Sequence, residues 1–158
     1  MVILFMQYLI IFLISMVPLI ELRGAIPYAI GFKLPLLPSY IICILGNMIP
    51  VPFIFLFARK ILVWGSDKKY IGGFFNWCLK KGEKGGKKLQ EKAGRGLYVA
   101  LFLFVGIPLP GTGAWTGTLA ASLLDMDFKK STLAVMCGVV LAGIIMGLVS
   151  GGVFSFIR

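Results

Sequence analysis

The chain has 158 residues, of which 59% are hydrophobic and 14% are charged, with a mean hydropathy of +0.96 and a net charge of +10. Soluble globular domains are about 45–50% apolar and about 25% charged, and a small domain cannot bury so large an apolar excess in its own core. The composition therefore excludes a water-soluble globular protein, and we expect the hydrophobic surface to face lipid.

Residues 1–35 form the first predicted element. The chain starts with an apolar run that lacks the positively charged start of a signal peptide, so we expect the run to be part of the mature structure. A break from Pro18 to Pro27 interrupts the run, which then continues to Phe32. Each apolar arm is shorter than the roughly 20 residues that a spanning helix needs, which predicts a re-entrant helical hairpin. In the alternative, residues 2–20 cross the membrane fully.

Residues 36–57 are long and apolar enough to form a transmembrane helix. Pro50 and Pro52 predict a kink in this helix, because proline lacks a backbone N–H group and clashes with the preceding turn. We expect the amide of Asn47 to find a partner inside the helical bundle.

Residues 58–96 form a polar loop that holds most of the 16 basic residues. A basic loop between hydrophobic segments is typical of the cytoplasmic side, so we predict a cytoplasmic loop that attracts anionic lipids, and no nucleic-acid partner. Residues 67–81 carry apolar side chains at helical spacing between lysines, which predicts an amphipathic helix on the membrane surface. The glycine-rich residues 82–96 are predicted to be a linker.

Residues 97–124 repeat the pattern of the first element, with two apolar arms around the sequence GIPLPGTG at 106–113. Pro108 and Pro110 forbid a continuous helix, so we predict a second re-entrant hairpin. Residues 131–157 form a second predicted transmembrane helix. The order predicts an all-α polytopic membrane protein with one membrane domain and two inverted half-repeats, a pattern that many secondary transporters use.

The last predicted span carries Gly143, Gly147 and Gly151 at four-residue intervals. Such a ridge of small residues lets helices approach closely, either within one chain or between two chains. Because four membrane elements are few to enclose a cavity, we expect a homodimer.

Glu21 and Arg23 are the only charged residues among the first 32. An ionisable group at membrane depth is costly, and it marks a functional site by default. A carboxyl group placed between apolar surroundings and a guanidinium can bind and release a proton. An unwound backbone before Gly24 would bring the two side chains together. In the alternatives, Glu21 caps a half-helix that begins near Gly24, or both charges lie at the headgroup boundary.

The second break has no charge. It offers backbone N–H groups at the start of a half-helix, the hydroxyl groups of Thr112 and Thr116, and the indole of Trp115. Such an arrangement can hold an anion, for example a phosphate or a carboxylate. It is not a nucleotide-binding P-loop, because no lysine follows the glycines. The alternative is a plain turn within a packed hairpin.

The chain has no histidine, and its three cysteines are far apart in apolar surroundings. The commonest metal ligand and the usual general base are therefore absent. We expect no metal, no cofactor and no enzymatic activity, because the sequence offers no nucleophile–base pair either.

The segments PLIELRGAIP and GIPLPGTGAWTG closely resemble the paired motifs of the small multidrug export family, which is similar to the larger DedA group of membrane proteins. The resemblance covers nearly the whole chain, with one motif in each half. It implies paired re-entrant loops in an inverted arrangement, and it places site residues at Glu21, Arg23, Pro27, Pro108, Pro110, Gly111, Thr112 and Gly113.

Through its DedA-like relatives, the resemblance also implies movement of phospholipids or polyprenyl phosphate carriers, with coupling to protons. The chain departs from the DedA pattern after the second proline-rich segment. Trp115 and Thr116 stand where those relatives often carry an arginine motif.

Three hypotheses about function follow. The first is a proton-coupled transporter or lipid translocase that binds a small anionic or amphipathic substrate where the two breaks meet. In it, Glu21 carries the proton, Arg23 attracts the anionic group, and the backbone of residues 111–116 completes the site. The second is a small-cation or drug exporter in which Glu21 binds the proton and the cation in turn. The third is a structural membrane protein that organises lipids without transport.

Overall fold

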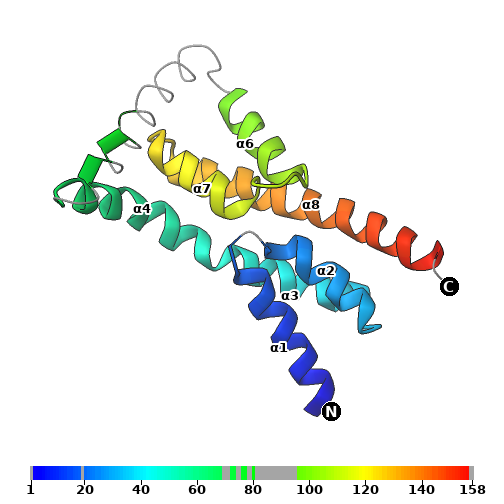
Figure 1. The fold of residues 1–158 in the computed structure, drawn as a ribbon. Coiled ribbons are helices and arrows are strands. Elements are labelled where there is room, and N and C mark those ends of the chain that lie inside the picture. The colour runs from blue at the N-terminus through cyan, green and yellow to red at the C-terminus, as the bar shows by residue number, and fades with distance from the viewer. Residues whose placement is uncertain are drawn as a thin grey trace.

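The helices of the molecule account for all the regular structure in the residues that the computed structural model describes (Figure 1). The described residues are 2–18, 20–68, 72–73, 76–77, 80 and 96–156. The main helices are α1 (Val2–Met16), α2 (Glu21–Gly31), α3 (Leu36–Met48), α4 (Pro50–Ser66), α6 (Gly96–Gly106), α7 (Ala114–Leu123) and α8 (Phe128–Phe156). The predicted all-α fold is confirmed.

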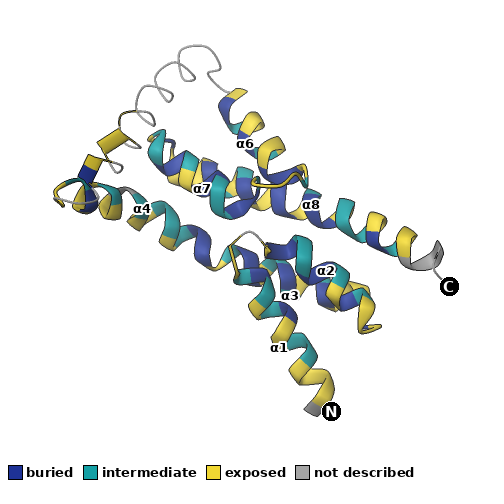
Figure 2. Ribbon diagram, in the orientation of Figure 1, coloured by how far each residue is buried: buried dark blue, intermediate teal, exposed yellow. Residues whose placement is uncertain are grey.

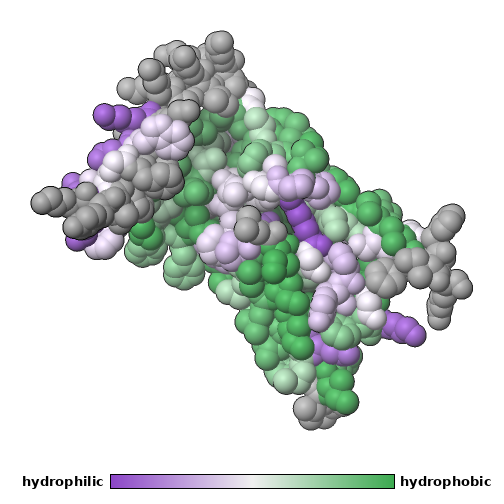
Figure 3. Space-filling view, viewed as in Figure 1, coloured by the Kyte–Doolittle hydropathy of each residue, from purple (hydrophilic) through white to green (hydrophobic). Residues whose placement is uncertain are grey.

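Two helical runs in the described part of the chain are long and apolar enough to cross a membrane. They are Leu36–Ser66, which joins α3 and α4, with a mean hydropathy of 2.3, and Phe128–Val153, with 2.5. Only 33% of the most apolar 18-residue stretch of the first run is buried, and only 28% of that of the second run. Neither run is therefore the core helix of a soluble protein. Hydrophobic side chains cover most of the visible surface, with hydrophilic groups mainly at the ends and in a small central patch (Figure 3). These features indicate a membrane protein.

The first long run differs from the predicted span of 36–57, because helix continues to Ser66. Arg59 and Lys60 interrupt the apolar pattern, but both are good helix formers and apolar residues follow them. The second run begins at Phe128, before the predicted residue 131.

The proline pair divides the first run at Ile49, which keeps helical dihedral angles (φ −59°, ψ −46°). Pro50 and Pro52 cannot donate the hydrogen bonds that would join the two helices into one uninterrupted ladder. Asn47, just before this junction, is buried. Its side-chain oxygen has no hydrogen-bond partner among the described residues, so the expected partner for that atom is not found.

The helices form two helical hairpins and two longer runs (Figure 1). α1 and α2 form the first hairpin, α6 and α7 form the second, and both turn back near the middle of the molecule. α1 and α2 pack on α3, and α2 also packs on α8. α6 packs on α8, and α7 packs on α4 and α8. The second arm of each hairpin therefore contacts the long run of the other half.

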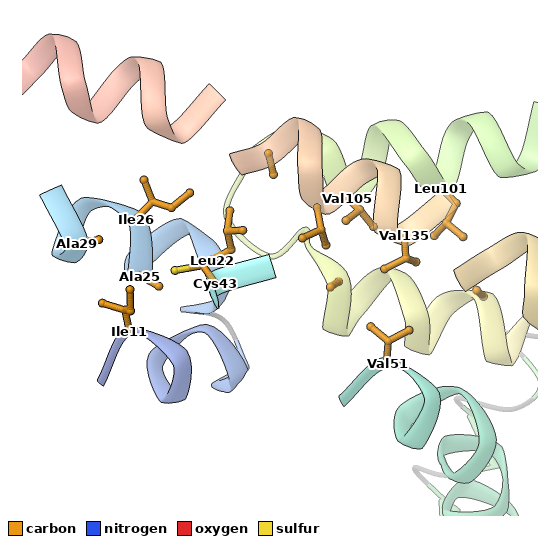
Figure 4. Close-up of a cluster of buried hydrophobic side chains, with 14 of the residues drawn as sticks. Ile11, Leu22, Ala25, Ile26, Ala29, Cys43, Val51, Leu101, Val105 and Val135 are labelled. Atoms are coloured by element: carbon orange, nitrogen blue, oxygen red, sulfur yellow. The ribbon is translucent and has the colours of Figure 1, made fainter. Parts of the chain in front are cut away.

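The buried hydrophobic side chains belong to one core cluster (Figure 4). Ile11, Leu22 and Cys43 contribute to it from α1, α2 and α3, and Val105 and Val135 contribute from α6 and α8. The outer end of α1 and much of the C-terminal part of α8 are exposed (Figure 2). A single core therefore connects the two halves of the chain.

Two of the three glycines of the ridge on α8 pack within the chain. A side chain at Gly143 would collide with the ring of Tyr40, and one at Gly147 would touch the same ring at 3.4 Å. These two glycines therefore serve close packing of α3 on α8.

Most of the predicted amphipathic helix 67–81 lies outside the described residues, as does the predicted linker up to residue 95.

Candidate functional site

The two breaks between the hairpin arms are shorter than the sequence predicted. The first break is 17–20, between the end of α1 and the start of α2, and the second break is 107–113, between α6 and α7. Glu21, Arg23 and Pro27 therefore lie within α2, and Trp115 and Thr116 lie within α7.

The carboxylate of Glu21 caps the first turn of α7. Its Oε2 accepts a hydrogen bond from the backbone N–H of Ala114 at 3.1 Å, and its Oε1 accepts one from that of Trp115 at 3.0 Å. The side chain is only 4% exposed. A helix N-terminus has unpaired N–H groups and a partial positive charge, both of which favour an anion. The predicted anion site of the second break is therefore filled by a carboxylate of the chain itself, and Glu21 caps α7 and not its own helix.

The backbone on both sides of this contact is unusual. Glu21 has φ 51°, a left-handed conformation that non-glycine residues rarely adopt, and Gly113 has φ 138°. A Cβ atom at Gly113 would lie 2.8 Å from Cδ of Glu21 and closer still to Oε2. Glycine at this position is what allows the carboxylate to approach the start of α7.

Arg23 binds the other end of the same hairpin. Its guanidinium donates to the carbonyl oxygens of Leu109, Val105 at 3.2 Å and Ile107 at 3.3 Å, and to the hydroxyl oxygen of Thr112 at 2.9 Å. These acceptors belong to the last turn of α6 and to the second break. Arg23 therefore binds carbonyl groups that have no helical partner because α6 ends there. Its positive charge also stabilises the negative C-terminal end of α6.

Trp115 makes the reverse connection. Its indole N–H donates to the carbonyl oxygen of Met16 at 3.1 Å, at the end of α1. Each hairpin therefore supplies a side-chain donor to the C-terminal end of the other hairpin's first arm.

The remaining predicted residues lie in or beside these breaks. Pro108, Pro110 and Gly111 are in the second break, and Gly111 has φ 79°. The hydroxyl of Thr116 lies 3.4 Å from the carbonyl oxygen of Gly113. Pro27 lies further along α2.

Glu21 and Arg23 do not pair as expected. Although the two charges interact at a distance, their hydrogen bonds run to opposite ends of the second break. The reason is that both residues lie on the first turn of α2, where positions two residues apart point in different directions.

A cavity of about 460 Å³ lies beside the breaks, and its surface is almost entirely apolar. Its wall is formed by Pro18, Glu21, Phe53, Ile54, Phe57, Ala58, Ile61, Thr112, Trp115, Thr116 and Leu119. Among the side chains of this wall that the structure describes, Glu21 is the one that carries a charge, and Arg23 is not among them.

The α4 side of this cavity was missed by the sequence reasoning. Phe53, Phe57 and Ile61 recur every four residues, which places them on one face of α4. That periodicity could have identified the face, but the sequence does not say that α7 and the breaks lie opposite. Among the described residues, no group of three or more Cys, Asp or Glu side chains could hold a metal ion.

Comparisons with curated proteins and with solved structures found no match. Residues 21–145 match the model of the family described as "Putative small multi-drug export protein". The matched region starts at Glu21 and includes Arg23, the second break, the first long run and the second long run as far as residue 145. Because it takes in most of the chain, the chain belongs to this family.

Proposed function

We propose that the chain is a multi-pass membrane transporter that exports apolar or amphipathic cations in exchange for protons. One observation carries this proposal: among the described side chains of an apolar cavity wall, Glu21 alone carries a charge, and the same carboxylate joins the two hairpins. A buried carboxylate in an apolar pocket can bind a cation or a proton, and its position between the hairpins links that binding to their arrangement.

The proposed topology has two re-entrant hairpins that enter from opposite sides. Support comes from their turns, which meet near the middle of the molecule, while the long runs extend past them on both sides (Figure 1). Irregular backbone at membrane depth is tolerated where protein surrounds it, and here Arg23, Glu21 and Trp115 satisfy the free backbone groups. The positive-inside rule favours a cytoplasmic position for the basic segment that follows α4.

The contacts of Arg23 favour a cation over an anion as the substrate. Its guanidinium already donates to three carbonyl oxygens and a hydroxyl, so binding an anionic headgroup would require breaking these bonds. Among its described lining residues, the cavity presents the carboxylate of Glu21 and no basic side chain. A lipophilic cation could place its apolar body against α4 and its charge near Glu21. This arrangement favours the drug-exporter hypothesis over an anion carrier or lipid translocase.

Protonation of Glu21 would weaken the contact between its carboxylate and the start of α7. A neutral carboxyl group has one oxygen that carries a proton and loses its charge interaction with the positive end of α7. Proton and cationic substrate would also compete for the same carboxylate, because each neutralises it. Exchange of one for the other therefore accompanies loosening and re-forming of the contact between α2 and α7.

The test uses the purified chain in proteoliposomes, with ethidium as the lipophilic cation and an imposed pH gradient. We expect ethidium movement that depends on the gradient, and a loss of at least about tenfold in the Glu21→Gln variant, since glutamine cannot exchange protons. The matched control is Asp67→Asn, which removes an exposed carboxylate at the end of α4. Thermal unfolding in detergent shows that each variant is folded.

Wild-type ethidium transport by folded Glu21→Gln would refute the proposal. Movement of a fluorescent phospholipid or a lipophilic anion, with none of ethidium, would instead support the anion carrier.

A further inference from the structure

Residues with unusual backbone conformations recur in the two halves of the chain, and corresponding residues are separated by a constant number of positions. Positive φ angles occur at Glu21 and Lys33 in the first half, and at Gly113 and Asp125 in the second half. The spacing from Glu21 to Lys33 equals that from Gly113 to Asp125. In each half, the first of these residues lies at the start of the second hairpin arm, and the other follows its end.

The turn after each second arm has the same hydrogen bond. The N–H of Leu34 donates to the carbonyl oxygen of Ala29, and the N–H of Met126 donates to that of Ala121, both at 3.0 Å. Leu34 and Met126 are separated by the same number of residues as Glu21 and Gly113, and so are Ala29 and Ala121. The local structure of the two halves is therefore repeated, although their sequences differ here.

Residues of the long helices also correspond, and they are separated by the same number of positions as Glu21 and Gly113. Ser39 and Ser131 are both 1% exposed. Gly46 packs against the backbone of α1, and Gly138 packs against the backbone of α6, which are the first arms of their own halves. Each long helix therefore uses one glycine to approach its first arm.

In the first arms, corresponding residues are separated by slightly fewer positions, because the second break is longer than the first. Tyr8 corresponds to Tyr98, and the buried Ile11 corresponds to the buried Leu101. Figure 4 shows both residues in the hydrophobic core, Ile11 on α1 and Leu101 on α6.

The contacts that join the hairpins are equivalent too. Arg23 and Trp115 occupy corresponding positions, and each donates to the end of the other half's first arm, at Val105 and at Met16 respectively. Glu21 has no such counterpart, because Gly113 occupies the corresponding position. Of these two corresponding positions, only the one in the first half therefore carries a carboxylate.

The hairpins differ in one respect. α1 packs closely along α2, whereas α6 makes few contacts with α7. The apolar cavity lies on the side of the more open hairpin, between α7 and α4. The structure is thus an asymmetric arrangement of two equivalent halves.

We propose that the chain has a second substrate site, equivalent to the cavity, between α2 and the C-terminal part of α8. This inference rests on the proposed function and assigns the residues of the opposite-facing state. Met146, Val149 and Val153 on α8 correspond to Ile54, Phe57 and Ile61 of the cavity wall. Pro27 on α2 corresponds to Leu119 on α7.

The second site opens when the first hairpin takes the open arrangement and the second hairpin closes. Two arrangements that exchange the roles of equivalent halves have similar contacts, so their free energies are similar and a small bias from one ligand can shift the population. Glu21 faces both sites in turn, and one carboxylate therefore binds the same cationic substrate from either side.

The test is the accessibility of single thiols in a variant whose three native cysteines are replaced. Ile54→Cys reports the present cavity and Met146→Cys reports the second site. Both side chains are half-buried in this structure. Leu148→Cys is the control for lipid exposure, because Leu148 is 73% exposed on α8 and does not correspond to a cavity residue. A membrane-impermeant maleimide is applied to each side of oriented vesicles over a range of pH.

We expect Ile54→Cys to react from the side of the α4–α7 cavity and Met146→Cys from the opposite side. Their rates should change in opposite directions with pH, by about tenfold, and Glu21→Gln should abolish the pH response. Leu148→Cys should stay unreactive, since lipid excludes the reagent.

Reaction of Met146→Cys from the same side as Ile54→Cys would overturn the inference, and so would rates that rise and fall together. The two proposals remain distinguishable. Proton-dependent ethidium transport without opposite labelling changes removes only the second site. Opposite labelling changes without ethidium transport remove the proposed substrate and leave the alternation of sites.

Discussion

At the scale of single residues, the conformation of Glu21 is maintained by its side chain. A non-glycine residue in a left-handed conformation costs about 1–3 kcal/mol. A hydrogen bond to a charged group contributes about 1.5–3 kcal/mol, and Glu21 accepts two from α7. The two bonds together exceed the strain, so the carboxylate can hold its own backbone in place. The strain would favour a different backbone conformation once those bonds are lost.

The first prediction tests the close approach of Glu21 to Gly113. Gly113→Ala should destabilise the fold by about 2–4 kcal/mol, because the new Cβ collides with the carboxylate and alanine disfavours φ 138°. In a Glu21→Ala background the collision is gone while the backbone strain remains. The cost of Gly113→Ala should therefore fall there by about 1 kcal/mol or more. Denaturant unfolding in detergent measures the free energy of unfolding of the wild type, the two single variants and the double variant. Additive costs of the two changes would contradict the contact.

The second prediction concerns the planar fork of Arg23. Arg23→Lys should destabilise the fold by about 2 kcal/mol, because one ammonium group cannot reach the carbonyl groups of Val105, Ile107 and Leu109 together. Arg23→Ala should cost only slightly more in the same unfolding measurement. If Arg23→Lys unfolds like the wild type, a single positive charge is enough and the fork geometry is irrelevant.

The residues that join the two hairpins could be selected from the sequence, but their partners could not. Glu21, Arg23 and the second break could be selected because charge at membrane depth and proline-rich backbone are both costly there. Their connections could not be predicted. The N–H of Ala114 is 93 positions from Glu21 in the chain, and no local pattern encodes a contact of that range. A contact between Glu21 and Arg23 required an unwound backbone before Gly24, and both residues instead lie in α2.

At the scale of helices, the end of α2 resembles the end of α7. Both are followed by a non-glycine residue with positive φ, Lys33 at 56° and Asp125 at 52°. Helices commonly end at such a position, and glycine is the residue that adopts it without strain.

The third prediction follows from this helix end. Lys33→Gly should stabilise the fold by about 1 kcal/mol, because it removes the steric cost of the left-handed conformation. Lys33→Ala is the matched control, since it removes the charge and most of the side chain but keeps the Cβ. The midpoint of thermal unfolding in detergent should rise for Lys33→Gly only. An equal rise in Lys33→Ala would assign the gain to the lost lysine side chain and not to the backbone.

Helix boundaries were predictable only where a residue type enforces them. Proline and glycine located both breaks, but the breaks proved narrower than their motifs because Glu21 and Trp115 already belong to helices. The end of α4 was placed too early, at Phe57, since charge marks a change of environment and does not stop a helix.

At the scale of the whole molecule, the halves are held together by crossed packing. α2 packs on α8 and α7 packs on α4, so each hairpin depends on the other half for part of its contacts. The fold class could be predicted from apolar runs and breaks. The cavity could not, because its walls come from α2, α4, α7 and both breaks, and only the crossed packing brings these together.

The last prediction tests whether the two halves use equivalent contacts. A Cβ at Gly46 would lie 2.7 Å from the carbonyl oxygen of Phe12, and one at Gly138 would lie 2.9 Å from that of Phe102. Backbone cannot move aside as a flexible side chain can, so Gly46→Ala and Gly138→Ala should each destabilise the fold by about 1–3 kcal/mol.

The matched control is Gly152→Ala, in the same helix as Gly138 but with open space around the added Cβ. Alanine is the better helix former, so this change should leave stability unchanged or raise it by about 0.5–1 kcal/mol. Because the two close contacts lie in separate hairpin–helix interfaces, their costs in the double variant should add. If Gly138→Ala costs no more than Gly152→Ala while Gly46→Ala is destabilising, the interfaces of the two halves differ and the equivalence of their helices fails.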